Sequence, residues 1–168
     1  NFDSKSYMDR DRVTIDQNLR RWFSRNLGTW HSKRTYFFSD EGPLNVEIFL
    51  KIQQYKERFY GDFRYLFDWW VEKDQDFFIK KSSYESSGQT TITLLGHQLF
   101  RSEFYLTNTS GKSNIKQVDE HELIFESNYS NWHIIEQTRL INEDQYRSRS
   151  IYSWENDDLK IVENHHEI

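Results

Sequence analysis

Two arginines separated by a single residue, Arg147 and Arg149, are the strongest candidates for chemistry in this sequence. If this segment is a β-strand, side chains at alternate positions share one face and lie about 7 Å apart. Two guanidinium groups at that spacing can each bind one carboxylate of a dianionic ligand in a bidentate manner. Charge at alternate positions is also typical of a strand face turned to solvent, so the residues alone leave both interpretations open.

A carboxylate on the preceding segment, Glu136, can join these arginines if the connecting hairpin has the right length. With a two-residue loop at Glu143 and Asp144, Thr138 lies opposite Arg149 and Glu136 lies diagonally across on the same face. A loop of another length would move Glu136 to the opposite face. In the first register the Glu136 carboxylate and the Arg149 guanidinium share one face of the hairpin.

Aromatic and charged side chains also share a strand face near the start of the chain. Trp30, Arg34 and Tyr36 stand at even spacing and point the same way if the segment is extended. Further along, the indoles of Trp69 and Trp70 could stack on a flat ligand, although core packing is the commoner role of such residues. The sequence therefore offers aromatic walls for a ligand as well as cations.

The composition excludes several other kinds of site. The 168 residues include no cysteine, which rules out disulfides, thiolate metal sites and a catalytic thiol. The six histidines show no metal-ligand spacing, so we expect no metal site. A net charge of −5 does not suggest a nucleic-acid partner. No apolar run approaches the roughly 18–20 residues that span a bilayer, so we expect no membrane span.

One helix is predicted near the N-terminus. Thr14 and Gln17 form a capping-box pattern, and Gly28 is a suitable C-terminal cap. One helical face collects the apolar residues Ile15, Leu19, Trp22, Phe23 and Leu27. Arg20, Arg21 and Arg25 lie mostly off that face, where we expect a solvated surface. Residues 1–13 are polar and are expected to be a flexible segment, and residues 14–168 to form a single domain.

After Gly28 the hydrophobic period changes to two, and turn-forming pieces such as Asn108–Asn114 separate the apolar runs. The predicted strands are 30–37, Leu44–Ile52, Phe63–Glu72, Phe77–Tyr84, Thr90–Leu95, Leu99–Thr107, Glu122–Tyr129, Trp132–Ile141, Tyr146–Trp154 and Leu159–His165. We predict a mostly β fold in which about ten antiparallel strands close into a barrel, because closure leaves no strand edge unpaired. A β-sandwich is the alternative.

The two ends of the chain resemble the phycobiliprotein lyases of the CpcS/CpeS type (the S/U-type family). In FSRNLGTWHSKRT, a helix runs into a strand with the pattern G-x-W-x-S-x-R-T, and Gly28, Trp30 and Arg34 are among the matching residues. ELIFES at Glu122–Ser127 and RSRS at Arg147–Ser150 resemble the family's later motifs. The terminal HEI resembles an E-I-R ending without its arginine, and the middle of the chain matches poorly.

The resemblance implies a lipocalin-like antiparallel barrel with an N-terminal helix that binds a linear tetrapyrrole. Such a lyase attaches a phycobilin by a thioether bond to a cysteine of an apo-phycobiliprotein subunit, so the phycobilin is a substrate and no prosthetic group is expected. The bilin-binding candidates are Trp30, Arg34, Trp69, Trp70, Glu126, Arg147 and Arg149. The catalytic candidates are Glu136, Arg147 and Arg149. Glu136 is the candidate general acid that would protonate the bilin as the thiol adds, and Glu126 is a weaker candidate acid. The family's setting implies a cytoplasmic or plastid-stroma location.

Two alternatives remain open at this point. A non-enzymatic lipocalin-like carrier of a hydrophobic carboxylate would share the strands, the helix and an arginine for the carboxylate. A structural or interaction domain would have a filled core and no ligand. The sequence does not choose between phycoerythrobilin and phycocyanobilin, and it leaves a homodimer open.

Overall fold

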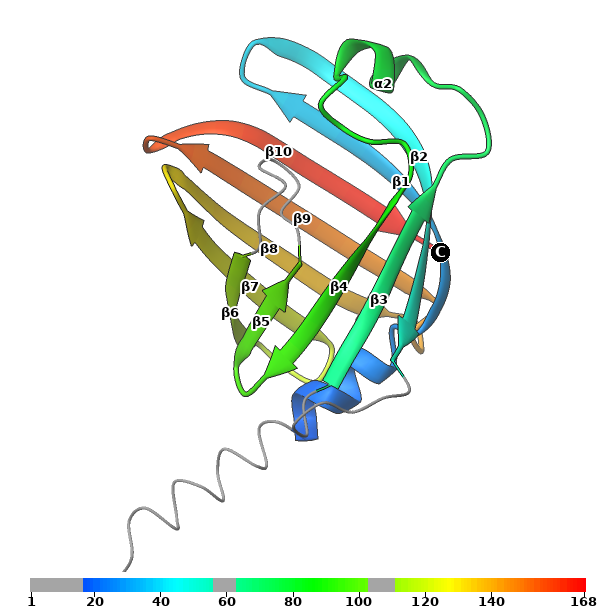
Figure 1. The fold of residues 1–168 in the computed structure, drawn as a ribbon, viewed down its shortest axis with the longest axis vertical. Coiled ribbons are helices and arrows are strands. Elements are labelled where there is room, and N and C mark those ends of the chain that lie inside the picture. The colour runs from blue at the N-terminus through cyan, green and yellow to red at the C-terminus, as the bar shows by residue number, and fades with distance from the viewer. Residues whose placement is uncertain (1–16, 56–62, 103–110) are drawn as a thin grey trace, which may run out of the picture.

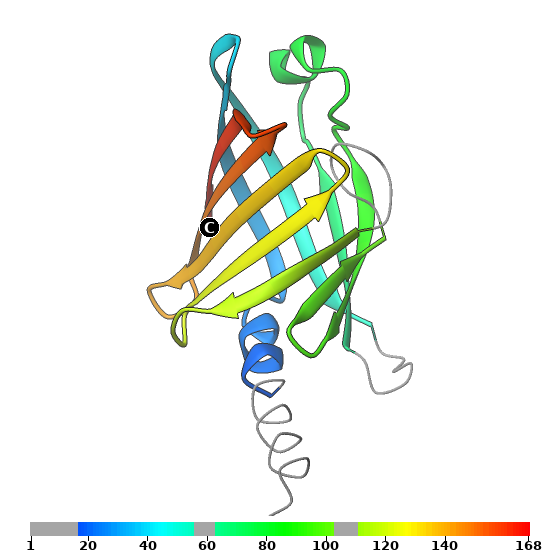
Figure 2. The same ribbon diagram turned by 90° about the vertical axis from the view of Figure 1, so that its left-hand side faces the viewer.

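Ten antiparallel strands form a closed barrel in the computed structural model, which describes residues 17–55, 63–102 and 111–168 (Figures 1 and 2). The strands are β1 (Gly28–Phe38), β2 (Glu41–Gln54), β3 (Phe63–Trp70), β4 (Gly88–Leu95), β5 (Gln98–Arg101), β6 (Gly111–Gln117), β7 (Glu122–Tyr129), β8 (Trp132–Ile141), β9 (Tyr146–Glu155) and β10 (Asp158–Glu167). Each pairs with its neighbours in sequence, and β1 also pairs with β10. The predicted barrel is confirmed, and the sandwich alternative is wrong.

Strand alternation separates the inside of the barrel from its surface. On β1, Trp30, Arg34 and Tyr36 are buried, while Lys33 and Phe37 on the opposite face are exposed. β2 repeats this pattern, with its alternate apolar residues inside and its polar residues outside. The two faces of each segment were therefore assigned correctly from the period of two.

The helix at residues 17–24 lies across one end of the barrel (Figures 1 and 2). Leu19, Trp22 and Phe23 are at most 4% exposed and pack inside this end, as their spacing predicted. Phe23 stacks on Tyr65 with ring centroids 5.3 Å apart. Thr14, Ile15 and residues 1–13 lie outside the described residues.

Arg25 differs from the solvated surface expected for it. Its guanidinium binds both carboxylate oxygens of Asp144, at 2.6 and 2.9 Å, in the β8–β9 turn. It also donates to the backbone oxygen of Glu120. These bonds fasten the end of the helix to two turns of the barrel, together with the bond from the Trp22 indole to the His121 carbonyl.

Two predicted elements are wrong. Phe77–Tyr84 is not a strand: Asp76–Lys80 forms the short helix α2, with acidic Asp76 in its first turn and basic Lys80 in its last. Such charges are favourable at those helix ends. The predicted turn at Asn108–Asn114 overlaps strand β6, whose inner face consists of Ser113 and Ile115. The part of the predicted strand Leu99–Thr107 beyond Ser102 lies outside the described residues.

The segment that contains α2 covers the end of the barrel opposite the helix at 17–24 (Figure 1). Gln75, just before α2, fixes it there, because its amide both accepts from the backbone N–H and donates to the backbone oxygen of Glu47, each at 2.8 Å. Phe77 enters a buried cluster with Tyr36, Val46, Ile48 and Ile161. The barrel thus has one end closed by packed apolar side chains and another covered by an aromatic cap.

Candidate ligand-binding site

The register of the β8–β9 hairpin decides which side chains meet inside the barrel. Thr138 pairs with Arg149, and Glu136 pairs with Ile151, so Glu136 and Arg149 share the inner face as the short loop predicted. Arg147 and Arg149 are each 5% exposed. The interpretation of these arginines as a solvent face is therefore wrong.

Inward-facing residues of β1, β10, β9 and β8, most of them polar, form three rows across these neighbouring strands. One row contains Arg34, His165, Arg149 and Thr138, which are paired in register across these strands. The row nearer the helical end contains Ser32, Glu167, Arg147 and Leu140 in the same strand order. The row nearer α2 contains Tyr36, Glu163, Ile151 and Glu136. A belt of buried charge therefore separates the packed end from the covered end.

Two of the buried arginines, Arg147 and Arg149, are ion-paired with buried carboxylates. Arg147 Nε lies 3.0 Å from Glu167 Oε1, and Arg149 Nη2 lies 3.1 Å from Glu136 Oε1. Arg149 Nη1 also lies 3.6 Å from Glu167 Oε2. Because Glu136 and Glu167 already neutralise much of this charge, a carboxylate ligand must share these arginines with the protein's own carboxylates.

The arginines keep the two carboxylates ionised despite burial. Burial by itself favours the neutral form of Glu136, but Arg149, Arg101 and the hydrogen bonds from Arg149 and Thr138 outweigh it and lower the pKa to about 2. Burial likewise opposes the charge of Glu167, and Arg147, Arg149 and Arg34 lower its pKa in spite of it. At neutral pH these contacts favour the ionised form of Glu136, which suits a hydrogen-bond acceptor and counter-ion better than the general acid expected for it.

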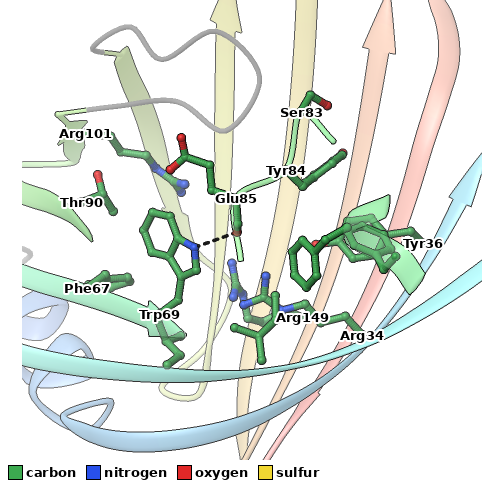
Figure 3. A pocket seen from close by; sticks show the side chains of 14 residues that line it. Arg34, Tyr36, Phe67, Trp69, Ser83, Tyr84, Glu85, Thr90, Arg101 and Arg149 are labelled. Atoms are coloured by element: carbon green, nitrogen blue, oxygen red, sulfur yellow. Dashed lines mark hydrogen bonds between the residues drawn. The ribbon is translucent and has the colours of Figure 1, made fainter. Parts of the chain in front are cut away.

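An aromatic pocket lies between this charged belt and α2 (Figure 3). Arg34, Arg149 and Arg101 supply its cations, and Figure 3 shows Trp69 and Tyr84 among its aromatic walls. The lining residues are Arg34, Tyr36, Ile48, Leu50, Phe67, Trp69, Phe77, Phe78, Ser83, Tyr84, Glu85, Thr90, Arg101 and Arg149. Two smaller hollows adjoin it through shared side chains such as Arg101. Aromatic walls around a few cations suit a flat, apolar ligand with acidic groups.

Besides Arg147 and Arg149, three predicted binding residues face the interior, at different depths. Arg34 and Trp69 line the aromatic pocket, and the Trp69 indole donates to the Glu85 carbonyl at 3.2 Å. Trp30 lies deeper in the packed core, where its indole donates to the Asn26 carbonyl at 2.8 Å. The Arg147 guanidinium carbon sits 5.4 Å from the Trp30 ring centre. Arg147 thus belongs to the floor of the site, and Arg34 and Arg149 belong to its open part.

Two predicted binding residues lie on the outer surface instead. Trp70 stacks on Phe49, 5.9 Å away, and Phe49 stacks on His31, 4.6 Å away, in an aromatic ladder outside β1, β2 and β3. Glu126 is exposed, while its neighbours Phe125 and Ser127 are buried. Adjacent residues of a strand point to opposite faces, so Trp70 cannot enter the pocket that Trp69 lines. Glu126 is likewise excluded as a candidate acid inside the barrel.

Several pocket residues were missed in the sequence. Glu163 and His165 fall on the inner face of β10, and neither is among the predicted binding residues. The alternation Ile161, Glu163, His165, Glu167 was the available signal. Phe77 and Tyr84 were assigned to a strand, and Arg101 lacks any pattern that marks it. Within the described residues no group of three or more histidine, aspartate or glutamate side chains is placed to hold a metal ion.

No protein-family model matches the chain, and no curated protein matches its sequence. Solved structures do match. The S-type phycobiliprotein lyase CPES from Guillardia theta has a TM-score of 0.62 at 16% identity, over 89% of this chain and 91% of that one. A protein of unknown function from the DUF3598 family of Nostoc punctiforme has a TM-score of 0.58 at 16% identity, over 86% and 47%.

A third match, Rv2717c from M. tuberculosis, has a TM-score of 0.51 at 8% identity and covers 89% of this chain and 95% of that one. At sequence identities this low, the structural matches establish a shared fold and nothing more. None of the helices in the described part of the chain has the length and apolar character needed to cross a bilayer. The chain has the barrel fold of an S-type phycobiliprotein lyase, as its terminal motifs predicted.

Proposed function

We propose that this protein is a phycobiliprotein chromophore lyase. It binds a linear tetrapyrrole, phycoerythrobilin or phycocyanobilin, and attaches it through a thioether bond to a cysteine of an apo-phycobiliprotein subunit. The phycobilin is its substrate, and the apo-subunit is its protein partner. The reaction needs no resident cofactor, because the reactive groups belong to the pigment and to the acceptor thiol.

The observation that supports this function best is the aromatic pocket bordered by Arg34, Arg149 and Arg101 in a barrel of the S-type lyase fold. A phycobilin is flat and largely apolar, and it carries two propionates. Its rings suit the walls formed by residues such as Trp69 and Tyr84, and its propionates suit the guanidinium groups. Glu136, which lines the adjoining hollow, would accept hydrogen bonds from pyrrole nitrogens.

The chain's part in the reaction is to position the pigment. The sequence contains no cysteine, so the protein cannot capture its own substrate covalently as a thioether. Holding ring A of the bilin toward an incoming thiol converts an unselective addition into an oriented one, and orientation alone can contribute several kcal/mol to a rate. Arg147, paired with Glu167 below the pocket, would keep Arg149 and its carboxylates in place.

Reconstitution tests the proposal. The purified protein is mixed with each bilin and each apo-phycobiliprotein subunit, and covalent pigment is detected by zinc-enhanced fluorescence on a denaturing gel. We expect transfer to exceed the spontaneous addition seen without the protein, and to vanish when the acceptor cysteine is replaced by alanine. Equal labelling with and without the protein would contradict a lyase function.

Two matched pairs of variants test the binding site. Arg34→Leu and Trp69→Ala remove groups that line the pocket, and we expect each to weaken bilin binding about tenfold or more. Lys33→Leu and Trp70→Ala change the neighbouring, outward-facing residues of the same strands and should leave bilin affinity almost unchanged. Equal losses within each pair would place the bilin outside the barrel.

A non-enzymatic carrier of a hydrophobic carboxylate is the second candidate function. The same pocket would bind such a ligand, and the ion pairs of Arg149 would serve the same purpose. The reconstitution separates the two functions, because a carrier binds bilin tightly and leaves the apo-subunit unlabelled above the spontaneous level.

A further inference from the structure

Two carboxyl groups, Glu136 and Glu163, face the same inner hollow from opposite sides of Ile151. Ile151 on β9 pairs with Glu136 on β8 and with Glu163 on β10. The two glutamates are thus two strands apart, or about 10 Å between backbones. Both line a hollow next to the aromatic pocket, together with Tyr36, Tyr84 and Arg101. A ligand that enters this hollow can contact either carboxyl group.

The two carboxyl groups have different partners. Glu136 receives a guanidinium of Arg149 at 3.1 Å and the hydroxyl of Thr138 at 2.8 Å, so both of its oxygens are bound as a carboxylate's would be. Among the described residues, the ion-pair contact of Glu163 is a histidine: His165 Nε2 lies 2.9 Å from its Oε1. Glu163 also accepts a hydrogen bond from Tyr36.

His165 cannot supply a lasting positive charge to Glu163. Its side chain is 1% exposed. On β10 it lies between two arginines, because it pairs with Arg34 on β1 and with Arg149 on β9. Burial and these two cations, with smaller effects from Arg147 and His166, lower its pKa well below the usual value. A neutral imidazole either donates from Nε2 to a carboxylate or accepts there from a protonated carboxyl group. The Glu163–His165 pair is therefore suited to hold one proton between its facing atoms.

The surroundings of Glu163 balance burial against positive charge. Burial is the larger effect and raises its pKa to about 7, while Arg34 and Arg149 act against it. The charged and titratable groups that face it from the other elements are Arg34 and Tyr36 on β1, Arg149 on β9, Glu136 on β8, Arg101 on β5 and Tyr84 after α2. A dianionic pigment bound at these arginines would screen their charge and favour the protonated form further.

We propose that Glu163, supported by His165 and Tyr36, is the proton donor to the bound tetrapyrrole during thioether formation. The inference rests on the proposed lyase function and names the group that serves it. Sulfur of the acceptor cysteine bonds to the outer carbon of the ring A ethylidene, and the carbon–carbon double bond opens. The ring carbon at the other end of that bond gains a proton from Glu163. The thiol's own proton is released and restores Glu163, so the net change is addition of S–H and needs no other reactant.

The test is the pH dependence of single-turnover transfer from protein already loaded with bilin. For the wild type we expect a bell-shaped profile: the rate rises with the thiolate of the acceptor and falls as Glu163 ionises. Glu163→Gln cannot donate, so its rate should be about 100-fold lower at neutral pH, and the falling limb should disappear. Its bilin affinity, followed by the absorbance change on binding, should stay within about threefold.

Two further variants separate a proton donor from a structural residue. Tyr36→Phe removes a hydrogen bond that lowers the pKa of Glu163, so the falling limb should move to higher pH while Glu163 itself is intact. Glu126→Gln removes an exposed, outward-facing carboxyl group and should leave the rate and its profile unchanged. Both variants keep Glu163, so their results are interpretable even if the Glu163→Gln variant folds poorly.

The proposal is overturned if Glu163→Gln keeps the wild-type rate and pH profile, or if its bilin affinity falls by the same factor as its rate. An unchanged limb in Tyr36→Phe would also contradict it. Failure of the lyase function itself has a separate signature, because wild-type protein would then bind bilin and never exceed the spontaneous labelling of the apo-subunit.

Discussion

The two ends of the barrel are built from the same strands and are used differently. At the helical end, Trp22 and Phe23 fill the interior against a cluster that includes Tyr65, Leu123 and Phe125. At the α2 end, the inner walls are aromatic as well, but they enclose a pocket bordered by arginines. The difference lies in what enters the barrel: a helix supplies side chains at one end, and a short cap leaves space at the other.

The comparison also separates stability from binding. Truncating a side chain in a packed interior lowers the free energy of unfolding, because the cavity that it leaves collapses only partly. A ligand pocket already contains empty space, so removing a wall there changes affinity more than folding. The belt of buried ion pairs between the two ends serves both stability and binding, since carboxylates must compensate its buried arginines in the folded barrel and those arginines also border the pocket.

The largest effect is expected from a cavity at the packed end. Phe23→Ala removes a ring that is 4% exposed and stacked on Tyr65, and we expect the free energy of unfolding to fall by about 4 kcal/mol. Urea unfolding followed by circular dichroism measures this. Leu27→Ala is the matched control, because Leu27 is 38% exposed on the same segment and should cost well under about 1 kcal/mol. Similar losses in both variants would show that the helix does not plug the barrel.

A slightly smaller effect is expected from the charged belt. Arg149→Leu leaves Glu136 and part of Glu167 without their counter-charge and should lower the free energy of unfolding by about 3 kcal/mol. The double variant with Glu136→Leu should recover much of that loss, because the carboxylate left without its main counter-charge is then removed as well. The same unfolding measurement checks both. A double variant less stable than the single one would contradict the ion-pair assignment.

The pH dependence of stability should differ between the two carboxyl groups. Because the pKa of Glu163 is raised from 4.5 to about 7, its proton stabilises the folded state at low pH, and this contribution is lost as pH rises from about 4.5 through 7. The pKa of Glu136 is lowered to about 2, so its contribution is lost instead as pH falls below about 4.5. Glu163→Gln should therefore flatten the unfolding free energy above about pH 4.5, by at most about 3 kcal/mol. Unfolding titrations at several pH values test this, and an unchanged slope would contradict it.

The smallest effect on stability is expected at the cap. Phe77→Ala removes a buried ring from α2, but this segment can move without breaking strand pairing, so we expect a loss of about 1–2 kcal/mol. Bilin affinity should fall more clearly than stability, because Phe77 lines the pocket. Ile79→Ala is the control on the same helix, since Ile79 is 79% exposed. A loss of stability as large as that of Phe23→Ala would remove the distinction between the two ends.

Much of the fold could be predicted from the sequence. The period of two grouped the side chains of β1 and β9 by face correctly, and the register expected for a short β8–β9 loop, which brings Glu136 to Arg149, is the observed one. Strand β6 was missed, because Ile115 is its only large apolar residue and its pairing with β5 and β7 decides its conformation. Helix α2 was missed for a related reason: five residues are too few for a helical period to show.

The sequence by itself determined the alternation of the strands, the apolar face of the N-terminal helix and the presence of two arginines on one face of a strand. These follow from local periods, because neighbouring side chains in a strand or helix have fixed directions. Only the tertiary structure decided that Glu167 and Glu136 neutralise those arginines, that Trp70 and Glu126 face outward, and that Glu163 faces the hollow beside His165. Closure of the barrel joins β1 to β10, the two ends of the chain, and no local pattern specifies the charges that such a long-range contact brings together.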